Sequence, residues 1–328
     1  MSNQKVFLVG ATGEVGRHVL NALIDHGSFD ITCFIRSSSE GKPSTRQLRG
    51  RGVKVAIGDL NGPLEAVIAM LENCDTVISC MSPAGLKDQI PLVDAAVQAG
   101  VKRFLPCNWG TPSARGGILA VKDIKEEIHD YIFQHRLGYT IIDVGFWYQA
   151  SLPRVPSGKF DSAIFMPIND VYAGGVTPNM LTDVRDVGRI TAEIVRDERT
   201  LNHRVIAYGD VLSQNEIHQI IEDKTGEKLQ LSTKTNDEAQ AALEQAKAAL
   251  GSNSDEKTNR FLLAAAQYAV TKYVRGDNTP ENARYLGYID ANELFPDFKY
   301  RSYAEFIDEV IAGKIERLYQ DVQIWKPS

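Results

Sequence analysis

Three glycines lie where an apolar run is followed by an amphipathic stretch, a place where backbone N–H groups can bind an anion. The apolar run Val6–Val9 is followed directly by the segment Gly10-Ala11-Thr12-Gly13-Glu14-Val15-Gly16. Glycines at a turn from strand to helix let the backbone bend tightly and approach a pyrophosphate at the helix N-terminus. We therefore expect residues 10–16 to bind the phosphates of a dinucleotide. The alternative is a tight turn that holds no ligand.

Arg36 stands at the end of the second predicted strand, where the choice of dinucleotide is made. An acidic residue there would bind the ribose hydroxyls of NAD, whereas an arginine accepts the 2′-phosphate of NADP. Three serines and then Lys42 follow, a small polar loop with basic ends that suits a phosphate, although Glu40 could reverse the preference. The pattern favours NADP(H). By topology, the ends of the third to fifth strands add further expected cofactor contacts, which are Asp59, Leu60, Cys80, Met81 and Cys107.

The helix predicted after the fifth strand carries two candidate proton donors, Lys122 and Lys125. A lysine beside a nicotinamide can donate or relay a proton while hydride moves, and its pKa falls when it is desolvated. Spacing alone does not choose between the two. The usual Tyr-x-x-x-Lys pair is missing from this helix. That string occurs at Tyr268 to Lys272, in the second half of the chain, where we interpret it as a coincidence.

Aromatic side chains follow the fifth and sixth predicted strands. Ligands of open α/β sheets bind beyond the carboxyl ends of the strands, so these segments should surround the substrate. Such aromatics can wall an apolar, planar molecule, although an aromatic cluster more often belongs to the core. The candidate substrate-binding residues are Asn108, Trp109, Phe146, Trp147 and Tyr148.

These residues are positioned by short apolar runs that alternate with longer amphipathic stretches. The alternation is typical of βαβ units and predicts an α/β fold with a Rossmann-type, doubly wound parallel sheet. The first helix has apolar residues at helical spacing and ends at Gly27. The predicted strands are Val6–Val9, Ile31–Ile35, Val53–Ile57, Thr76–Cys80, Arg103–Leu105 and Thr140–Val144.

The character of the chain changes after Gly145, and proline and glycine in 151–175 indicate irregular structure. We expect residues 1–150 to form an NADP-binding Rossmann domain, rejoined by a strand near 204–209. Residues 151–328 should form a smaller, partly interleaved α/β region that binds substrate and closes the core. Helices are predicted at 185–197, 214–224 and 237–250, the last ended by Gly251 to Ser254, with a further helical pattern around Phe306.

Composition narrows the function classes. The chain has 328 residues, 43% hydrophobic, and its net charge of -6 gives no positive field for nucleic acid or an acidic membrane surface. No long apolar run and no secretory pattern at the start are present, so the cytoplasm is the expected location. The four cysteines and the histidines lack metal-site spacing, so no metal is expected. A monomer and a homodimer both remain open.

The chain resembles the NmrA-like and isoflavone reductase-like branch of the atypical short-chain dehydrogenases, and most of all its fungal members. The resemblance spans most of the sequence, and the spacing G-x-x-G-x-x-G is itself typical of short-chain dehydrogenase relatives. The segments that carry it are Gly10–Gly16, Arg36, Ala99–Pro106, the lysine helix, Tyr139–Gly145 and Leu181–Arg189.

The resemblance implies an NADP(H)-dependent oxidoreductase with a lysine in place of the usual tyrosine. In the family an apolar residue follows this lysine three positions later. Lys125 is followed by Ile128 and fits that register, whereas Lys122 is followed by Lys125. The resemblance therefore selects Lys125 as the proton-transferring group, where it also contacts the cofactor, and it supports Arg36 and Lys42 at the 2′-phosphate.

The sequence departs from the plant members after the fifth strand. Plant reductases usually have Pro-Ser-Glu-Phe-Gly there, whereas this chain has Pro106-Cys107-Asn108-Trp109-Gly110. Isoflavones and lignans therefore do not carry over as substrates, and we expect an aromatic or polyketide-like molecule whose carbonyl or conjugated alkene is reduced by NADPH. The alternatives are a non-catalytic NADP-binding sensor or regulator, and a cofactor-retaining isomerase, dehydratase or cyclase.

Overall fold

Five apolar runs in the first third of the chain form one parallel sheet in the computed structural model, which describes residues 3–250 and 256–320. The strand order is β3-β2-β1-β4-β5, so the chain winds outward from β1 in both directions. Val6 of β1 faces Ile31 of β2 on one side and Thr76 of β4 on the other. The strands are β1 (Gln4–Val9), β2 (Phe29–Arg36), β3 (Lys54–Gly58), β4 (Thr76–Ser79) and β5 (Arg103–Leu105).

Two further strands extend this sheet. Phe104 forms a parallel bridge with Tyr139, which places β6 (Thr140–Asp143) beside β5. β10 (His203–Ile206) is hydrogen-bonded to β6 in turn. The predicted α/β fold class with a doubly wound parallel sheet is confirmed. Strands such as β4 are buried along their whole length, because helices cover both faces of a parallel sheet.

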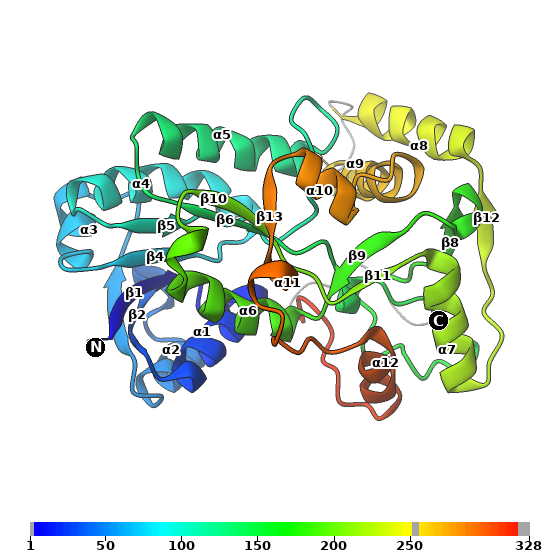
Figure 1. Cartoon of the computed structure of the whole chain (residues 1–328), viewed down its shortest axis with the longest axis horizontal. Helices are drawn as coiled ribbons and strands as arrows, with labels where there is room; N and C mark the ends of the chain where they lie inside the picture. Colours follow the sequence, from blue (N-terminus) through cyan, green and yellow to red (C-terminus); the bar gives the residue numbers. More distant parts are fainter. Residues whose placement is uncertain (1–2, 251–255, 321–328) are drawn as a thin grey trace. The chain divides into compact units, whose positions relative to one another are not determined.

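Helices pack on the two faces of the sheet. Figure 1 shows α3, α4 and α5 over one face and α1, α2 and α6 over the other. α1 and α6 approach so closely that a Cβ at Gly188 would lie 2.2 Å from the carbonyl oxygen of His18, which explains the glycine in α6. The helices are α1 (Glu14–His26), α2 (Pro43–Arg49), α3 (Leu64–Met70), α4 (Gln89–Gln98), α5 (Ala120–Gln134) and α6 (Val184–Arg196).

The chain divides into two compact units that interleave along the sequence. Unit 1 comprises the described residues of 1–109, 123–143 and 184–205, and unit 2 those of 110–122, 144–183 and 206–328. The boundary that we expected at residue 150 stays a prediction, and the two units do not divide the chain at a single position. Residues 110–122 belong to unit 2, whereas the helix predicted at 185–197 is α6 of unit 1, because it packs against α1.

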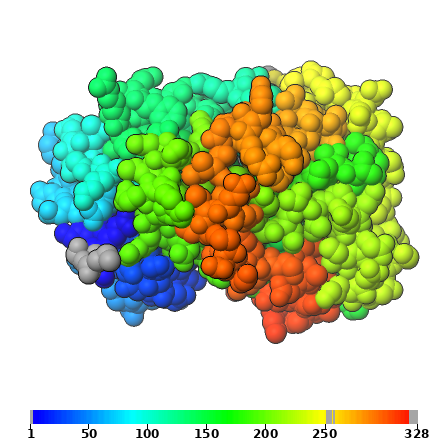
Figure 2. All heavy atoms as spheres, viewed as in Figure 1, coloured from blue at the N-terminus to red at the C-terminus, as the bar shows by residue number. Residues whose placement is uncertain are grey.

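Unit 2 contains short strands and several helices. β7 (Phe146–Trp147), β9 (Asn179–Thr182) and β11 (Asp210–Leu212) form one sheet, and β8 (Asp170–Tyr172) pairs with β12 (Ser232–Lys234). α10 lies on the face seen in Figure 2, within the orange segment, and Tyr285 at its end is 87% exposed. The remaining elements are α7 (Gln214–Thr225), α8 (Asn236–Ala249), α9 (Glu256–Ala269), the π-helix η6 (Val270–Val274), α10 (Pro280–Tyr285), β13 (Tyr288–Asp290), α11 (Ala291–Leu294) and α12 (Tyr303–Ile311).

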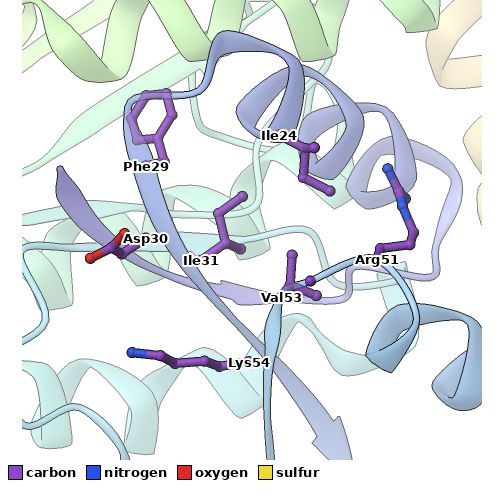
Figure 3. Close-up of a pocket in the computed structure, with 8 residues that line it drawn as sticks. Ile24, Phe29, Asp30, Ile31, Arg51, Val53 and Lys54 are labelled. Carbon is purple, nitrogen blue, oxygen red and sulfur yellow. The ribbon is translucent and has the colours of Figure 1, made fainter.

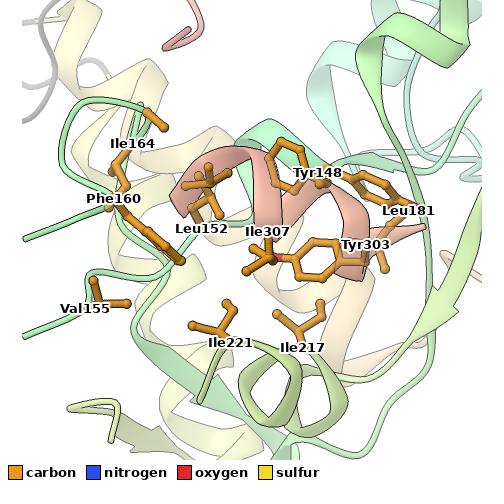
Figure 4. Packing of buried hydrophobic residues seen from close by; sticks show 13 residues of the cluster. Tyr148, Leu152, Val155, Phe160, Ile164, Leu181, Ile217, Ile221, Tyr303 and Ile307 are labelled. Atoms are coloured by element: carbon orange, nitrogen blue, oxygen red, sulfur yellow. The ribbon is translucent and has the colours of Figure 1, made fainter. Parts of the chain in front are cut away.

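The core of unit 2 gathers around Tyr148 (Figure 4). α12 begins with a capping box at Ser302, and its apolar residues at helical spacing pack on this core beside α7. The predicted helices at 214–224 and 237–250 correspond to α7 and α8, whereas the predicted break at Gly251 to Ser254 lies outside the described residues. Across the described ranges, no helix combines the length and the apolar character needed to cross a membrane.

Candidate functional site

The turn between β1 and α1 is closed so tightly that glycine is required at two of its positions. Gly10 has a φ of +82°, and a Cβ there would lie 2.3 Å from the carbonyl oxygen of Cys80. A Cβ at Gly16 would lie 2.0 Å from the carbonyl oxygen of Gly10. The N–H of Gly13 donates to that same oxygen at 2.9 Å. The turn therefore keeps side chains away from the start of α1, as the glycine spacing predicts.

The N-terminus of α1 is open to an anion. Its N-cap is Gly13, which has no side chain to bind the first N–H groups of the helix. These groups and the helix dipole give this end a partial positive charge. The carboxylate of Glu14 lies 3.2 Å from the guanidinium of Arg17, which offsets the negative charge of Glu14 beside an incoming phosphate. Among the other turn residues, Ala11 and Val15 are buried and Thr12 is exposed.

The loop after β2 offers two unengaged basic side chains. Arg36 is the last residue of β2, Ser37–Ser39 form a single 3₁₀ turn, and Lys42 is the exposed N-cap of α2. Among the described residues, neither Arg36 nor Lys42 has an ion-pair partner. A carboxylate oxygen of Glu40 lies 3.6 Å from a guanidinium nitrogen of Arg49. Because this ion pair partly offsets the negative charge of Glu40, that charge repels a 2′-phosphate less than the sequence alone suggests. This arrangement fits the phosphate contacts expected of Arg36 and Lys42.

Asp59 and Leu60 follow β3 in a tight turn. A carboxylate oxygen of Asp59 accepts the N–H of Asn61 at 3.0 Å, and Leu60 is buried. Asp59 is thus held by its own loop while its side chain stays exposed. Their expected place beside the adenine remains a prediction.

Two buried thiols, Cys80 and Cys107, lie at the ends of β4 and β5, and that of Cys107 links the two ends. The Cys107 thiol donates to the carbonyl oxygen of Met81 at 3.1 Å, and the Cys107 N–H donates to the side chain of Gln89 at 2.7 Å. Burial raises the pKa of both the Cys80 and the Cys107 thiols. Both therefore stay protonated and uncharged at neutral pH, which leaves this edge of the sheet without a nucleophilic thiolate.

Lys125 lies at this edge of unit 1. Its Nζ donates a hydrogen bond to the backbone carbonyl of Asn108, directly after β5, and its positive charge partly counteracts the raised pKa of Cys107. α5 is fixed by the bidentate pair of Glu126 and Arg204, with N–O distances of 2.8 and 2.6 Å. The half-buried Lys125 is thus held where the sheet topology predicts the reacting groups.

Lys122 has different surroundings, one helical turn earlier. It is 2% exposed, and its Nζ donates to the hydroxyl of Tyr288 at 3.2 Å, within unit 2. A lysine enclosed in this way is suited to a structural role. Burial and partners therefore separate two lysines that spacing leaves equivalent, and they agree with the choice of Lys125.

Asn108 and Trp109 are folded into the end of the sheet. Both side chains are buried, and Trp109 has a φ of +45°. Its indole N–H donates to the carbonyl oxygen of Ser79 at 3.2 Å, which ties the end of β5 to the end of β4. Trp109 therefore has at least a structural role, and substrate contact by either residue remains a prediction.

The aromatics after β6 separate into two groups. Tyr148 is fully buried in the core of unit 2, and its hydroxyl donates to Asp210 at 2.7 Å. This is the core role that we named as the alternative for such a cluster. Phe146 and Trp147 are partly exposed in β7 and remain the better candidates for a substrate wall.

The Tyr-x-x-x-Lys string in the second half of the chain proves to have an unusual environment. Lys272 is 3% exposed, and its Nζ lies 3.1 Å from the ring centre of Phe146, 4.7 Å from that of Tyr273 and 6.0 Å from that of Tyr268. Desolvation lowers its pKa well below the usual value. Cation–π contacts contribute about 2 kcal/mol in such sites, whereas burying an ion costs several kcal/mol, so the neutral amine is favoured. Sequence spacing alone gave no signal for this burial.

A pocket of about 260 Å³ lies elsewhere in unit 1. Figure 3 shows it between Ile24 of α1, the start of β2 at Phe29–Ile31, and residues 51–54, which lead into β3. These are the amino ends of the strands, at the edge opposite the glycine turn, so this pocket is separate from the candidate cofactor site. The described part of the chain contains no cluster of three or more potential metal ligands.

A doubly wound parallel sheet with a glycine turn at the exit of its first strand defines a Rossmann-type dinucleotide-binding protein. The chain belongs to the NmrA-like family, whose model matches residues 2–322. The resemblance predicted from the sequence is thus confirmed.

Individual relatives agree with this assignment. The chain is 38% identical over 312 residues to asnovolin J 5′,6′-dehydrogenase of Aspergillus novofumigatus, covering 94% of this chain and 95% of the relative. It is 27% identical to an isoflavone reductase homologue of Zea mays, covering 94% and 98%. Among solved structures, the NADPH complex of leucoanthocyanidin reductase from Vitis vinifera matches with a TM-score of 0.77 at 23% identity, covering 94% of this chain and 99% of the other.

Proposed function

We propose that this protein is an NADP(H)-dependent oxidoreductase that acts on a small, conjugated organic molecule, with Lys125 as the proton-transferring group. The observation that carries the proposal is the position of Lys125 at the exit of β5, at the carboxyl edge of a sheet whose glycine turn suits a diphosphate. The names of the relatives support it, since they describe a dehydrogenase and reductases of small molecules. A non-catalytic sensor has no need of a lysine held at this edge.

The described residues fit the cofactor at three points. The turn at Gly10 and Gly16 has no room for a Cβ, and the start of α1 is uncapped by any side chain. Arg36 and Lys42 supply positive charge for a 2′-phosphate. When bound there, the dinucleotide supplies or accepts a hydride.

Lys125 handles the proton that accompanies the hydride. In reduction, its ammonium donates a proton to the substrate atom that becomes electron-rich, and the amine recovers the proton from solvent. The carbonyl of Asn108 accepts one N–H of Lys125, which limits the rotation of the amine. The uncharged thiols of Cys80 and Cys107 add no competing charge. Oxidation, as in the name of the dehydrogenase relative, is the reverse of these steps.

The test is the variant Lys125→Met, which removes the amine and keeps most of the chain length. Substrates are found by following NADPH consumption with planar enones and aryl ketones. We expect turnover to fall by about 10²–10⁴-fold, the usual contribution of a positioned acid or base, while most of the NADPH affinity is retained. Lys87→Met, at a side chain that is 76% exposed, is the control and should keep full turnover. Full activity of Lys125→Met on a substrate that the wild type turns over would overturn the proposal.

A further inference from the structure

Lys272 takes part in none of the steps above, yet it is buried among aromatic rings in unit 2. It lies in η6, a π-helical segment, and single π-helical turns occur frequently at functional sites. No carboxylate of the described residues contributes charge at this amine, and its pKa is lowered by desolvation alone. A lysine enclosed without a counter-charge contributes little to folding that an apolar residue would not contribute better. Its presence therefore calls for another explanation.

Two of the three rings around the amine are partly exposed, and the third is buried. Tyr273 is buried and stacks on Tyr172, with ring centres 5.6 Å apart and planes at 6°. Phe146 and Tyr268 are partly exposed, and their ring centres lie 6.2 Å apart. The buried amine thus has two partly exposed aromatic side chains beside it, which offer stacking faces to a flat molecule.

The amine also has unused hydrogen-bonding capacity. Its hydrogen bond is to the hydroxyl of Tyr273, at 3.3 Å, and it otherwise faces the rings. A neutral amine has two N–H donors, and the ammonium that forms when it takes up a proton has three. A ligand oxygen that displaced the face of Phe146 would meet an N–H donor in an apolar setting, where charge attraction is little screened.

We propose that Lys272, with the rings of Phe146 and Tyr268, forms a substrate-recognition site that selects planar conjugated molecules carrying an acidic enol or phenol oxygen. This inference rests on the proposed oxidoreductase function and names its substrate class. The rings stack on the conjugated plane, and the amine binds the oxygen. An acidic oxygen is preferred over a ketone because its anion restores the charge balance of a protonated Lys272, so binding takes up one proton when the free ligand is an anion.

Two of the titratable groups near the amine do not change this proton count. The groups that face the amine are Tyr268 and Tyr273, and Tyr172 stacks behind Tyr273. Burial raises the pKa of Tyr172 to about 12 and that of Tyr273 higher still, so both stay neutral between about pH 7 and 9.

The experiment measures probe binding by titration calorimetry at about pH 8, in buffers of different ionisation enthalpy, which yields the number of protons taken up. The probes are 4-hydroxycoumarin, a planar enol that is an anion at this pH, and its neutral methyl ether 4-methoxycoumarin. The proteins are the wild type, Lys272→Met and the control Lys228→Met, whose side chain is 86% exposed. NADPH affinity is measured on each preparation, so a failure of the proposed cofactor function is distinguished from a failure of this site.

We expect the wild type and Lys228→Met to bind 4-hydroxycoumarin with uptake of about one proton, and to prefer it over the methyl ether. Lys272→Met should bind the enol at least about tenfold more weakly, with no proton uptake, and should keep its NADPH affinity. Absence of enol binding by the wild type, or unchanged proton uptake in Lys272→Met, would overturn the proposal.

A second measurement needs only the wild type, should Lys272→Met fail to fold. If binding takes up one proton, the affinity for 4-hydroxycoumarin falls about tenfold for each unit of rising pH while the free amine is neutral. An affinity that does not depend on pH between about 7 and 9 contradicts a role for Lys272 in binding the enol oxygen.

Discussion

Two lysines one helical turn apart show why spacing alone does not assign a catalytic role. Lys122 is enclosed and hydrogen-bonded to Tyr288, whereas Lys125 is half-buried and held at the exit of β5. The difference comes from tertiary neighbours that are distant in sequence. The family register points to Lys125 without this information, and the catalytic role of Lys125 stays a prediction.

Arg36 should determine the choice between NADPH and NADH. Arg36→Ala removes a charge-assisted contact of about 1.5–3 kcal/mol, so the affinity for NADPH should fall by about 10–100-fold while that for NADH is unchanged. Fluorescence titration with both dinucleotides measures the two affinities. Arg51→Ala is the control, because Arg51 lies at the opposite edge of the sheet. An equal loss for both dinucleotides would show that Arg36 does not read the 2′-phosphate.

Tyr268 tests whether the Tyr-x-x-x-Lys string acts as the usual catalytic pair. Tyr268→Phe keeps the ring beside Lys272 and removes only the hydroxyl, so we expect turnover close to that of the wild type. A proton-transferring tyrosine would instead lose about 10²–10⁴-fold. Steady-state kinetics on a substrate of the wild type make the measurement, with the exposed Tyr285→Phe as control. A loss as large as that of Lys125→Met would favour the usual pair.

At the scale of elements, the turn from β1 to α1 should fail when one glycine gains a methyl group. Gly16→Ala would place a Cβ 2.0 Å from a backbone oxygen, so the turn must open and its phosphate contacts are lost. We expect NADPH to raise the melting temperature of the wild type but not that of Gly16→Ala.

Gly27→Ala, at the other end of α1, is the matched control. Gly27 has a φ of +73°, but a Cβ there meets no atom within 4 Å. The substitution should cost about 1 kcal/mol of stability and keep the full stabilisation by NADPH. A normal NADPH shift in Gly16→Ala would contradict the role given to the turn.

Elements with a strong local signal could be predicted from the sequence, and elements that depend on distant neighbours could not. The strand predicted at 103–105 and the helix predicted at 237–250 match β5 and α8 to within a residue, because burial and helix propensity act locally. β7 and β8 have two and three residues, too few for a periodic pattern. η6 was also missed, since a π-helical turn and the rings around Lys272 depend on tertiary packing.

At the scale of the whole molecule, the order of segments along the chain does not follow the two units. The sequence indicated an interleaved arrangement, but it did not show that residues 110–122 join unit 2 or that α6 packs against α1. Such assignments depend on which apolar faces meet in three dimensions. In the sequence, Gly188 is a single glycine in a predicted helix, and nothing there indicates that α1 packs closely against it.

Titration of the wild-type protein with NADPH and NADH in a calorimeter tests the account most directly, because every assigned role depends on a dinucleotide at the glycine turn. We predict one NADPH bound per chain, with an affinity at least about tenfold higher than that for NADH. Folded protein that takes up neither dinucleotide, with no heat of binding and no shift in melting temperature, would contradict the account.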